Sequence, residues 1–378
     1  MKPIRIRDLF FSFLKLGLTA FGGPAMVAYI QDLAVDKKKW LDEKTFQEGV
    51  ALAQAIPGAT AMQVVAYVGF KTRGNIGGLV SFISFGLPAF LLMLFLSYVY
   101  TKTYNLPEVI SIFAGLQAIV VAIVANAFLS FAKPVIKSVG KIIVAIFSFL
   151  LFLFKISPFL IIIACFLLSQ IIFKDTPDHK FQNSKKFNFV GIFILILFIG
   201  LIFLYFLDKF LFKLSLIMMK IDLFAFGGGY ASVPLMLHEI VDRLHWLDSK
   251  TFMDGIALGQ ITPGPIVITA TFVGYLIRGF LGAIVATISV FIPSFIIMAF
   301  ASEISEKIRN SKIFLRAKKG LLASFSGLLL FATFKFIILV EWNFLKLTIA
   351  LGSFLALYKK INIFYVVLIG AIISSIIF

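Results

Sequence analysis

The chain contains the same unusual series of motifs twice. In each half an Ala-Phe-Gly-Gly stretch is followed, in order, by Trp-Leu-Asp, a glutamine, Pro-Gly, Arg-Gly and a further proline. The offset between the copies stays at about 205 to 206 residues, which indicates a duplicated domain rather than a chance pair of similar stretches. The matched landmarks are Phe21 and Phe226, Trp40 and Trp246, Gln54 and Gln260, Pro57 and Pro263, Arg73 and Arg278, and Pro88 and Pro293.

Composition places both copies in a membrane. Of the 378 residues 61% are hydrophobic and only 14% are charged, and there are 46 phenylalanines. A soluble core of this length cannot hide so much apolar surface, and the apolar runs have the length of membrane-spanning helices. The alternation typical of a membrane β-barrel is absent. The sequence therefore predicts an all-α, polytopic membrane protein.

The ionisable residues exclude several function classes. The net charge of +17 is spread over many loops instead of one soluble face, which indicates the positive-inside rule and not nucleic-acid binding. The one cysteine lies in an apolar run and the three histidines lack ligand spacing, so we expect no disulfide, metal or other cofactor. No catalytic signature is present, and we expect no enzyme activity.

Apolar runs between charge clusters divide the chain into three parts. We expect a first repeat at 1–173, a cytoplasmic linker with one extra transmembrane helix at 174–209, and a second repeat at 210–378. Each repeat has about six transmembrane or broken helices. The predicted spans are 9–35, 46–70, 76–100, 107–131, 138–154, 157–173, 188–207, 211–237, 252–277, 280–302, 314–338, 341–357 and 361–378.

The odd seventh span predicts that the repeats are inverted. Six crossings return the chain to its starting side, and one more places the second copy in the membrane upside down. With thirteen crossings and the N-terminus inside, basic residues favour the cytoplasmic loops by roughly two to one. If the second span of each copy re-entered the membrane without crossing it, the basic residues would be divided almost evenly between the two sides. We therefore prefer thirteen crossings.

The Phe-Gly-Gly stretches predict breaks within membrane helices. In the first copy two glycines lack side chains and a proline lacks an amide donor, which frees carbonyl groups. A half-helix that begins there directs its N–H groups and positive dipole end into a cavity, an arrangement that suits an anion. Close helix packing through small residues is the alternative. The residues are Phe21, Gly22, Gly23, Pro24, Phe226, Gly227 and Gly228.

A second pair of breaks follows a glutamine. Pro-Gly ends one half-helix and begins another, and a glutamine three residues earlier offers two uncharged donors that can coordinate a tetrahedral oxyanion. The alternative is a glutamine that bonds across helices. The residues are Gln54, Pro57, Gly58, Gln260, Pro263, Gly264 and Pro265.

Charged residues near the breaks have two predicted roles. Arg73 and Arg278 follow the broken spans, where a guanidinium attracts a divalent oxyanion or extends to the membrane interface. Glu48 and Asp254 are the matched acidic candidates for proton coupling, while Asp222 and Glu239 have no matched partner. Solvated capping at a helix start is the alternative for the matched pair.

The motifs resemble the chromate ion transporters in their long-chain, two-domain form. The first half carries Phe-Gly-Gly-Pro at 21–24, Ala-Gln-Ala-Ile-Pro-Gly at 53–58, Tyr-Val-Gly at 67–69 and Leu-Pro at 87–88. The second half carries Phe-Gly-Gly-Gly-Tyr at 226–230, Gln-Ile-Thr-Pro-Gly-Pro at 260–265 and Phe-Val-Gly-Tyr at 272–275. Ala59 and Gly229 depart from the family pattern, which has proline at both places.

The resemblance implies a multi-pass carrier of the cytoplasmic membrane. It implies transport of chromate, with sulfate as an analogue, generally outward and coupled to the proton motive force. The expected partners are therefore the anion, protons and the lipid bilayer. A carrier for another oxyanion or a small organic acid, and a passive anion channel, remain alternatives. The sequence leaves open whether the carrier forms a homodimer.

Overall fold

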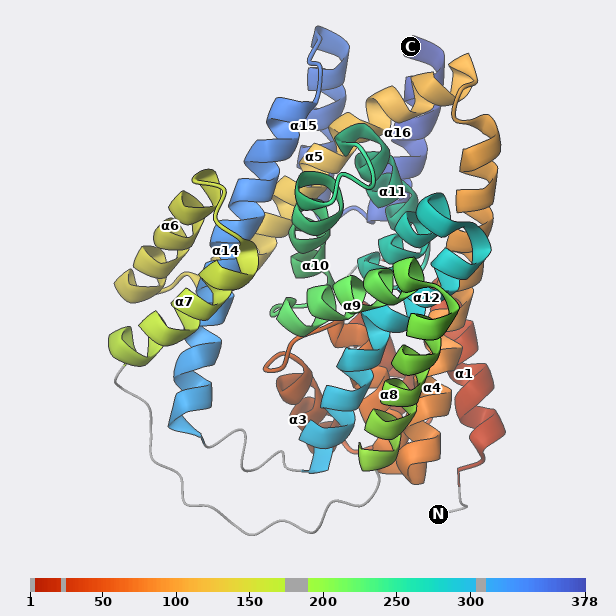
Figure 1. Cartoon of the computed structure of the whole chain (residues 1–378), viewed down its shortest axis with the longest axis vertical. Helices are drawn as coiled ribbons and strands as arrows, with labels where there is room; N and C mark the ends of the chain where they lie inside the picture. Colours follow the sequence, from red (N-terminus) through yellow and green to blue (C-terminus); the bar gives the residue numbers. More distant parts are fainter. Residues whose placement is uncertain (1–3, 22–24, 174–189, 304–310) are drawn as a thin grey trace. The chain divides into compact units, whose positions relative to one another are not determined.

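The computed structural model describes residues 4–21, 25–173, 190–303 and 311–378 (Figure 1). Within these ranges every regular element is a helix and there is no strand, which confirms the predicted all-helical class. The elements of the first half are α1 (Ile6–Thr19), α2 (Ala25–Gln31), the π-helix η1 (Asp32–Lys37), α3 (Glu43–Ala53), α4 (Thr60–Thr103), α5 (Pro107–Val135), α6 (Val139–Leu153) and α7 (Pro158–Ile172).

The second half repeats this order after one additional helix, α8. The elements are α8 (Val190–Leu207), α9 (Lys209–Phe224), α10 (Gly229–Met236), the π-helix η2 (Leu237–Arg243), α11 (Ser249–Ile261), the 3-10 turn η3 (Ile266–Ile268), α12 (Thr269–Glu303), α14 (Lys312–Leu339), α15 (Phe344–Tyr358) and α16 (Ile363–Ile377).

The two halves share unusual backbone features at matched positions. Asp42 caps α3 and Asp248 caps α11, and each carboxylate accepts a hydrogen bond of 2.9 Å from the amide three residues later. Shortly before these caps, Lys39 and His245 both have a φ of +50°. The π-helices η1 and η2 also occupy corresponding places. Such conformations are uncommon, so their recurrence supports a duplicated fold.

Both α4 and α12 are helical hairpins rather than single straight helices. The glycine of the Arg-Gly pair has a φ of +62° in α4 and +59° in α12, a conformation that favours glycine. The arms then run side by side: a Cβ on Gly86 would lie 3.0 Å from Met62 Cε, and the hydroxyls of Thr271 and Thr287 are 2.7 Å apart. The turns thus lie where the sequence predicts that one span ends and the next begins.

The chain forms two compact units. Each unit draws on both halves of the sequence, so the units do not coincide with the predicted repeats. The first unit consists of Met1–Leu94, Pro177–Ser232 and Pro263–Phe314, and the second unit consists of Phe95–Thr176, Val233–Thr262 and Leu315–Phe378.

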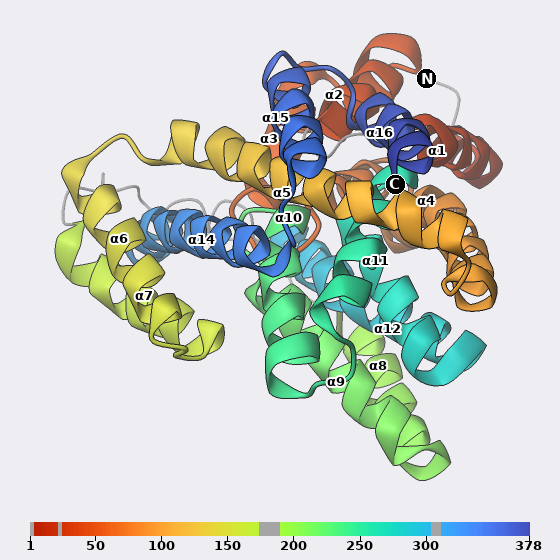
Figure 2. The same cartoon turned by 90° about the horizontal axis from the view of Figure 1, so that it is seen from above.

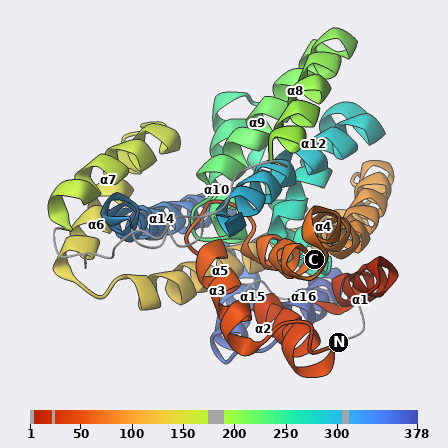
Figure 3. The ribbon, with the colours of Figure 1, turned by 90° about the horizontal axis from the view of Figure 1, so that it is seen from below.

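In the first unit α9 packs along α12, and α8 packs against both (Figure 3). Leu214 and Met218 of α9 and Val290 of α12 are fully buried there. A polar contact lies among them, since the Ser289 hydroxyl donates to the Ser215 hydroxyl at 2.7 Å. The result is an apolar helix pair that holds a few buried polar groups in fixed positions.

The second unit exchanges helices between the halves. Helix α5 packs against α15 and α16, and α14 packs against α6 and α7 (Figures 1 and 2). The contacts are equivalent: the Gly115 amide donates to Ser374 Oγ at 2.9 Å, and a Cβ on Gly320 would lie 2.3 Å from Ser169 Cβ. Gly115 matches Gly320, and Ser169 matches Ser374, at the repeat offset of about 205 residues. Each long helix therefore packs on the last two helices of the other half.

Several helices have the composition of membrane spans. By length and composition, four are long and apolar enough to cross a bilayer: Thr60–Thr103, Pro107–Val135, Ile266–Glu303 and Lys312–Leu339. Five shorter apolar helices accompany them in the described ranges. On α8 the side chains of Phe198, Phe203 and Phe206 are exposed, as expected of a helix that faces lipid. The protein is thus a multi-pass membrane protein, and thirteen crossings stay a prediction.

Candidate functional site

The Phe-Gly-Gly break of the second half separates α9 from α10. Gly227 and Gly228 have φ values of +104° and +94°, which side-chain-bearing residues rarely adopt. Within the described ranges no group accepts a hydrogen bond from either amide. The break therefore offers two backbone donors. In the matching stretch Phe21 is half-buried, while Gly22, Gly23 and Pro24 lie outside the described residues.

The Pro-Gly breaks have nearly identical geometry in the two halves. Gly58 follows α3 with a φ of +110°, and Gly264 follows α11 with a φ of +111°. A Cβ on Gly58 would lie 1.8 Å from Ser294 Oγ, so both conformation and space require glycine there. The Pro57 carbonyl accepts a hydrogen bond of 2.5 Å from Gln63 Nε2. In the second half Pro263 and Pro265 are buried on either side of Gly264.

Reciprocal hydrogen bonds join the breaks of the two halves within the first unit. The Gly58 amide donates to the Ala225 carbonyl at 2.9 Å, and the Gly264 amide donates to the Ala20 carbonyl at 2.9 Å. Each alanine directly precedes a Phe-Gly-Gly stretch. The Pro-Gly break of each half is therefore joined to the residue just before the other half's Phe-Gly-Gly stretch. Because the Gly58 and Gly264 amides already bind carbonyl groups, they are not available as donors to an anion.

The two matched glutamines have different environments. Gln54 ends α3 and is exposed. Gln260 lies near the end of α11 with 6% exposure, and its Nε2 is buried without a hydrogen-bond partner in the described part of the chain. An unpaired buried amide costs free energy unless a ligand or water satisfies it, so Gln260 is a potential donor to a ligand.

Sequence reasoning missed a third glutamine, Gln63. It is fully buried, its Nε2 binds the Pro57 carbonyl, and its Oε1 has no partner among the described residues. Nothing in the local sequence marks it, because an interior glutamine of a membrane helix usually bonds to a neighbouring helix.

The two arginines occupy the hairpin turns. Arg73 and Arg278 have φ/ψ values of −142°/26° and −141°/27°, and both side chains are exposed. Arg278 has nearby partners: its guanidinium lies 3.6 Å from the Asp208 carboxylate and 4.8 Å from the Phe210 ring centre. The two arginines therefore share the turn conformation, and Arg278 also forms an ion pair with Asp208.

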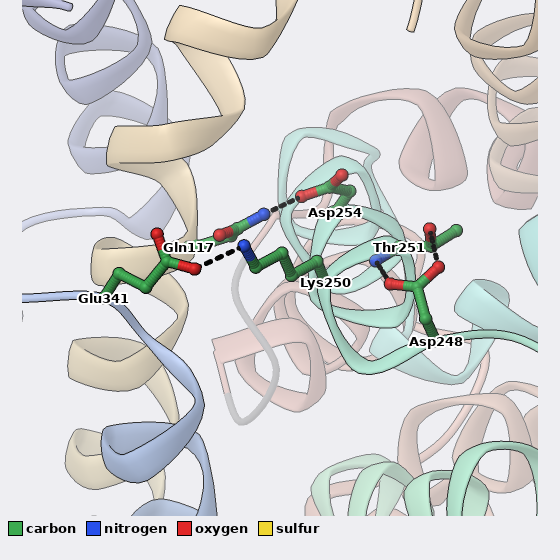
Figure 4. A network of polar contacts seen from close by, with 6 residues as sticks. All are labelled: Gln117, Asp248, Lys250, Thr251, Asp254 and Glu341. Atoms are coloured by element: carbon green, nitrogen blue, oxygen red, sulfur yellow. Dashed lines mark hydrogen bonds and ion pairs between the residues drawn. The ribbon is translucent and has the colours of Figure 1, made fainter.

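Asp254 forms a buried polar cluster in the second unit (Figure 4). Its carboxylate accepts hydrogen bonds of 2.9 Å from Gln117 Nε2 and from Tyr100 Oη. The matched Glu48 is only half-buried on α3. Neither residue caps its helix, because Asp42 and Asp248 do so, and this rules out the capping alternative. Tyr100 and Gln117 were not predicted, since they come from distant parts of the sequence.

Asp248 and Lys250 at the start of α11, and Glu341 between α14 and α15, lie near this cluster (Figure 4). Partial burial raises the pKa of Asp248, but hydrogen bonds from Thr251 outweigh it, so the pKa lies below the usual aspartate value. Lys250 Nζ donates a hydrogen bond of 2.7 Å to the Glu341 carboxylate. The Lys250–Glu341 pair is exposed on both sides and therefore contributes little to stability.

The chain matches a known protein family across both halves. The family model of the chromate transporter matches residues 7–170 and 212–375. The uncharacterized transporter MJ0718 of Methanocaldococcus jannaschii is 48% identical over 98% of this chain and 94% of its own length. The probable chromate transport protein of Synechococcus elongatus is 32% identical over 80% of this chain and 77% of its own. The chromate transport protein of Cupriavidus metallidurans is 32% identical over 77% of this chain and 72% of its own length. No solved structure matches the chain.

Proposed function

Because the chain belongs to the chromate transporter family, we propose that it is a secondary carrier that moves chromate outward across the cytoplasmic membrane. One relative is named a probable chromate transport protein and another a chromate transport protein. The observation that supports a carrier most strongly is the pair of reciprocal hydrogen bonds that joins the helix breaks. Broken helices that meet are a recurrent way to build a substrate site in secondary transporters.

The proposed anion site uses donors at these breaks. The Gly227 and Gly228 amides and the side chains of Gln54 and Gln260 supply hydrogen bonds, and Arg73 and Arg278 attract the anion. Uncharged donors suit an oxyanion that must be released again. The other predicted residues shape the breaks: Phe21, Gly22, Gly23, Pro24, Pro57, Gly58, Phe226, Pro263, Gly264 and Pro265.

Alternating access follows from the duplication. The repeats 1–173 and 210–378, joined by the linker and extra helix at 174–209, lie inverted in the membrane, so that two similar conformations open the site to opposite sides. The shared hairpins, caps and exchanged helix pairs support this proposal, because each described α-helix and π-helix of one repeat has a counterpart in the other.

The test is chromate uptake into proteoliposomes of the purified full chain. The membrane potential is clamped, and the interior is made acid relative to the exterior. A proton-coupled exporter exchanges internal protons for external chromate, so we expect chromate to accumulate above its external concentration and excess sulfate to suppress it. A passive channel would only equilibrate chromate. If the vesicles took up another oxyanion or an organic acid but no chromate, that anion and not chromate would be the substrate.

Proton coupling gives a second prediction. Asp254 is buried with two neutral donors, whereas Glu48 is half-buried. We therefore expect Asp254→Asn to reduce acid-driven accumulation by about tenfold, the gain from one proton at a pH difference of about one unit. Glu48→Gln should have a smaller effect. Equal losses in the two variants, or a larger loss in Glu48→Gln, would contradict this assignment.

A further inference from the structure

A second acidic side chain lies in the interior of the first unit. Asp222 of α9 is 1% exposed, and its carboxylate accepts hydrogen bonds from Ser294 of α12. The Ser294 amide donates to Oδ2 at 2.7 Å, and the hydroxyl lies 2.8 Å from Oδ1 and 2.7 Å from Oδ2. Among the described residues no cation pairs with Asp222. A buried carboxylate without a counter-ion is costly in a membrane protein and points to a function.

Ser294 connects this carboxylate to a helix break. Its Oγ accepts a hydrogen bond of 3.1 Å from the amide of Ala59, which directly follows Pro57-Gly58. Position 59 is also where this chain departs from the Pro-Gly-Pro pattern, and only a residue other than proline has an amide hydrogen to donate. The Ala59 amide, the Ser294 hydroxyl and the Asp222 carboxylate thus form one hydrogen-bonded series.

The first half has no equivalent of this series. Gly17 stands where Asp222 stands in the second half, and Ala89 stands where Ser294 stands. The space at Gly17 is closed, because a Cβ there would lie 2.4 Å from the Phe85 carbonyl oxygen. The carboxylate and the hydroxyl are therefore not required to build the duplicated fold.

The charged and titratable groups on the surrounding helices do not contact Asp222. Every polar contact of the Asp222 carboxylate within the described residues is made by Ser294. The break that reaches Ser294 has no titratable side chain from Ala55 to Thr60. The titratable groups on the packed elements are Lys209, Lys213 and Lys220 on α9, Tyr205 on α8, Tyr275, Arg278 and Glu303 on α12, and Glu43, Lys44 and Glu48 on α3.

We propose that Asp222 is a proton-binding residue of the carrier and that its protonation loosens the Pro57-Gly58 break. This inference rests on the proposed function and deepens it. The ionised carboxylate only accepts hydrogen bonds, so it fixes the Ser294 hydroxyl as its donor and leaves a lone pair for the Ala59 amide. When a proton binds, the carboxyl group becomes a donor and its nearest acceptor is Ser294 Oγ. To accept this bond the Ser294 hydroxyl must turn its own hydrogen away from the carboxyl group, which redirects its lone pairs and weakens the hydrogen bond from the Ala59 amide.

The test separates proton coupling from transport itself. Wild type, Asp222→Asn and the control Asp8→Asn, an exposed carboxylate on α1, are compared in proteoliposomes for chromate exchange at equal pH and for acid-driven accumulation. Asparagine has nearly the shape of aspartate but does not titrate. We expect exchange by Asp222→Asn within about twofold of wild type, and a loss of accumulation of about tenfold at a pH difference of about one unit.

The outcomes distinguish this inference from the proposed function. Normal accumulation in Asp222→Asn, or loss of exchange in a folded variant, would overturn the proton-binding role. If Asp222→Asn does not fold, Ser294→Ala provides the test, because it keeps the carboxylate and removes the link to Ala59. Reduced accumulation with retained exchange supports the inference, and wild-type accumulation overturns it. No chromate exchange in wild type would remove the proposed function and this inference together.

Discussion

Replacing Gly58 by alanine is expected to destabilise the protein and abolish chromate uptake. The φ of +110° is strained for alanine, at about 1–3 kcal/mol, and the new Cβ would lie 1.8 Å from Ser294 Oγ. Overpacking adds a further cost of about 1–3 kcal/mol. A shift of either Ser294 or the break would also disturb the hydrogen bond from Gly58 to Ala225. Thermal unfolding in detergent and proteoliposome uptake measure the two effects.

The matched control for this variant is Gly352→Ala. Gly352 lies within α15, where an added Cβ would meet no atom within 4 Å, and alanine favours a helix by up to about 1 kcal/mol over glycine. Its melting temperature should stay the same or rise, with normal uptake. If Gly58→Ala melted and transported like Gly352→Ala, the tight junction described for the helix breaks would be wrong.

Removing both matched glutamines is expected to abolish transport without preventing folding. A hydrogen bond to a charged ligand contributes about 1.5–3 kcal/mol, so Gln54→Ala with Gln260→Ala should reduce chromate uptake by about a hundredfold or more. Gln260 should account for the larger share, because its buried Nε2 has no partner within the described residues. Its replacement removes an unsatisfied donor, so expression and melting temperature should change little.

Gln47→Ala is the control for the double variant. Gln47 is an exposed residue of α3 that bonds to Glu43 at 2.8 Å, and it lies two turns before Gln54. Uptake by Gln47→Ala should equal that of wild type. Chromate flux at the wild-type rate in the double variant would refute the proposed role of the two glutamines.

Local signals in the sequence predict much of the fold. The Pro-Gly and Phe-Gly-Gly motifs predict the positions of the helix breaks, because proline restricts the backbone and glycine frees it wherever they occur. The Arg-Gly pairs fall between predicted spans, and the structure forms hairpin turns there. The repeat offset of about 205 residues predicts that matched residues share a conformation, and the φ values of Gly58 and Gly264 agree within a degree.

Contacts between distant segments could not be predicted in this way. The hydrogen bond from Gly58 to Ala225 involves a backbone carbonyl, which no residue type marks. Tyr100 and Gln117 donate hydrogen bonds to Asp254 from helices whose packing depends on the exchange between the halves. For the same reason Gln54 and Gln260 look equivalent in the sequence, although Gln54 is exposed and Gln260 is buried in the structure.

Differences between the repeats contain a signal that sequence reasoning used only in part. Asp222 is an acidic residue without a matched partner in the first half. The matched positions Ala89 and Ser294 also differ, and that difference was not used in the prediction. Comparing the halves residue by residue would have found both changes together. In a duplicated carrier the shared residues build the fold, and the unmatched polar residues identify where the two halves differ in chemistry.

Equilibrium dialysis of purified wild-type protein against labelled chromate shows whether the two halves build one anion site. We expect saturable binding of one chromate per chain, which sulfate displaces and the double glutamine variant loses. Two independent sites per chain, one for each repeat, or binding that survives the loss of both glutamines, would contradict it.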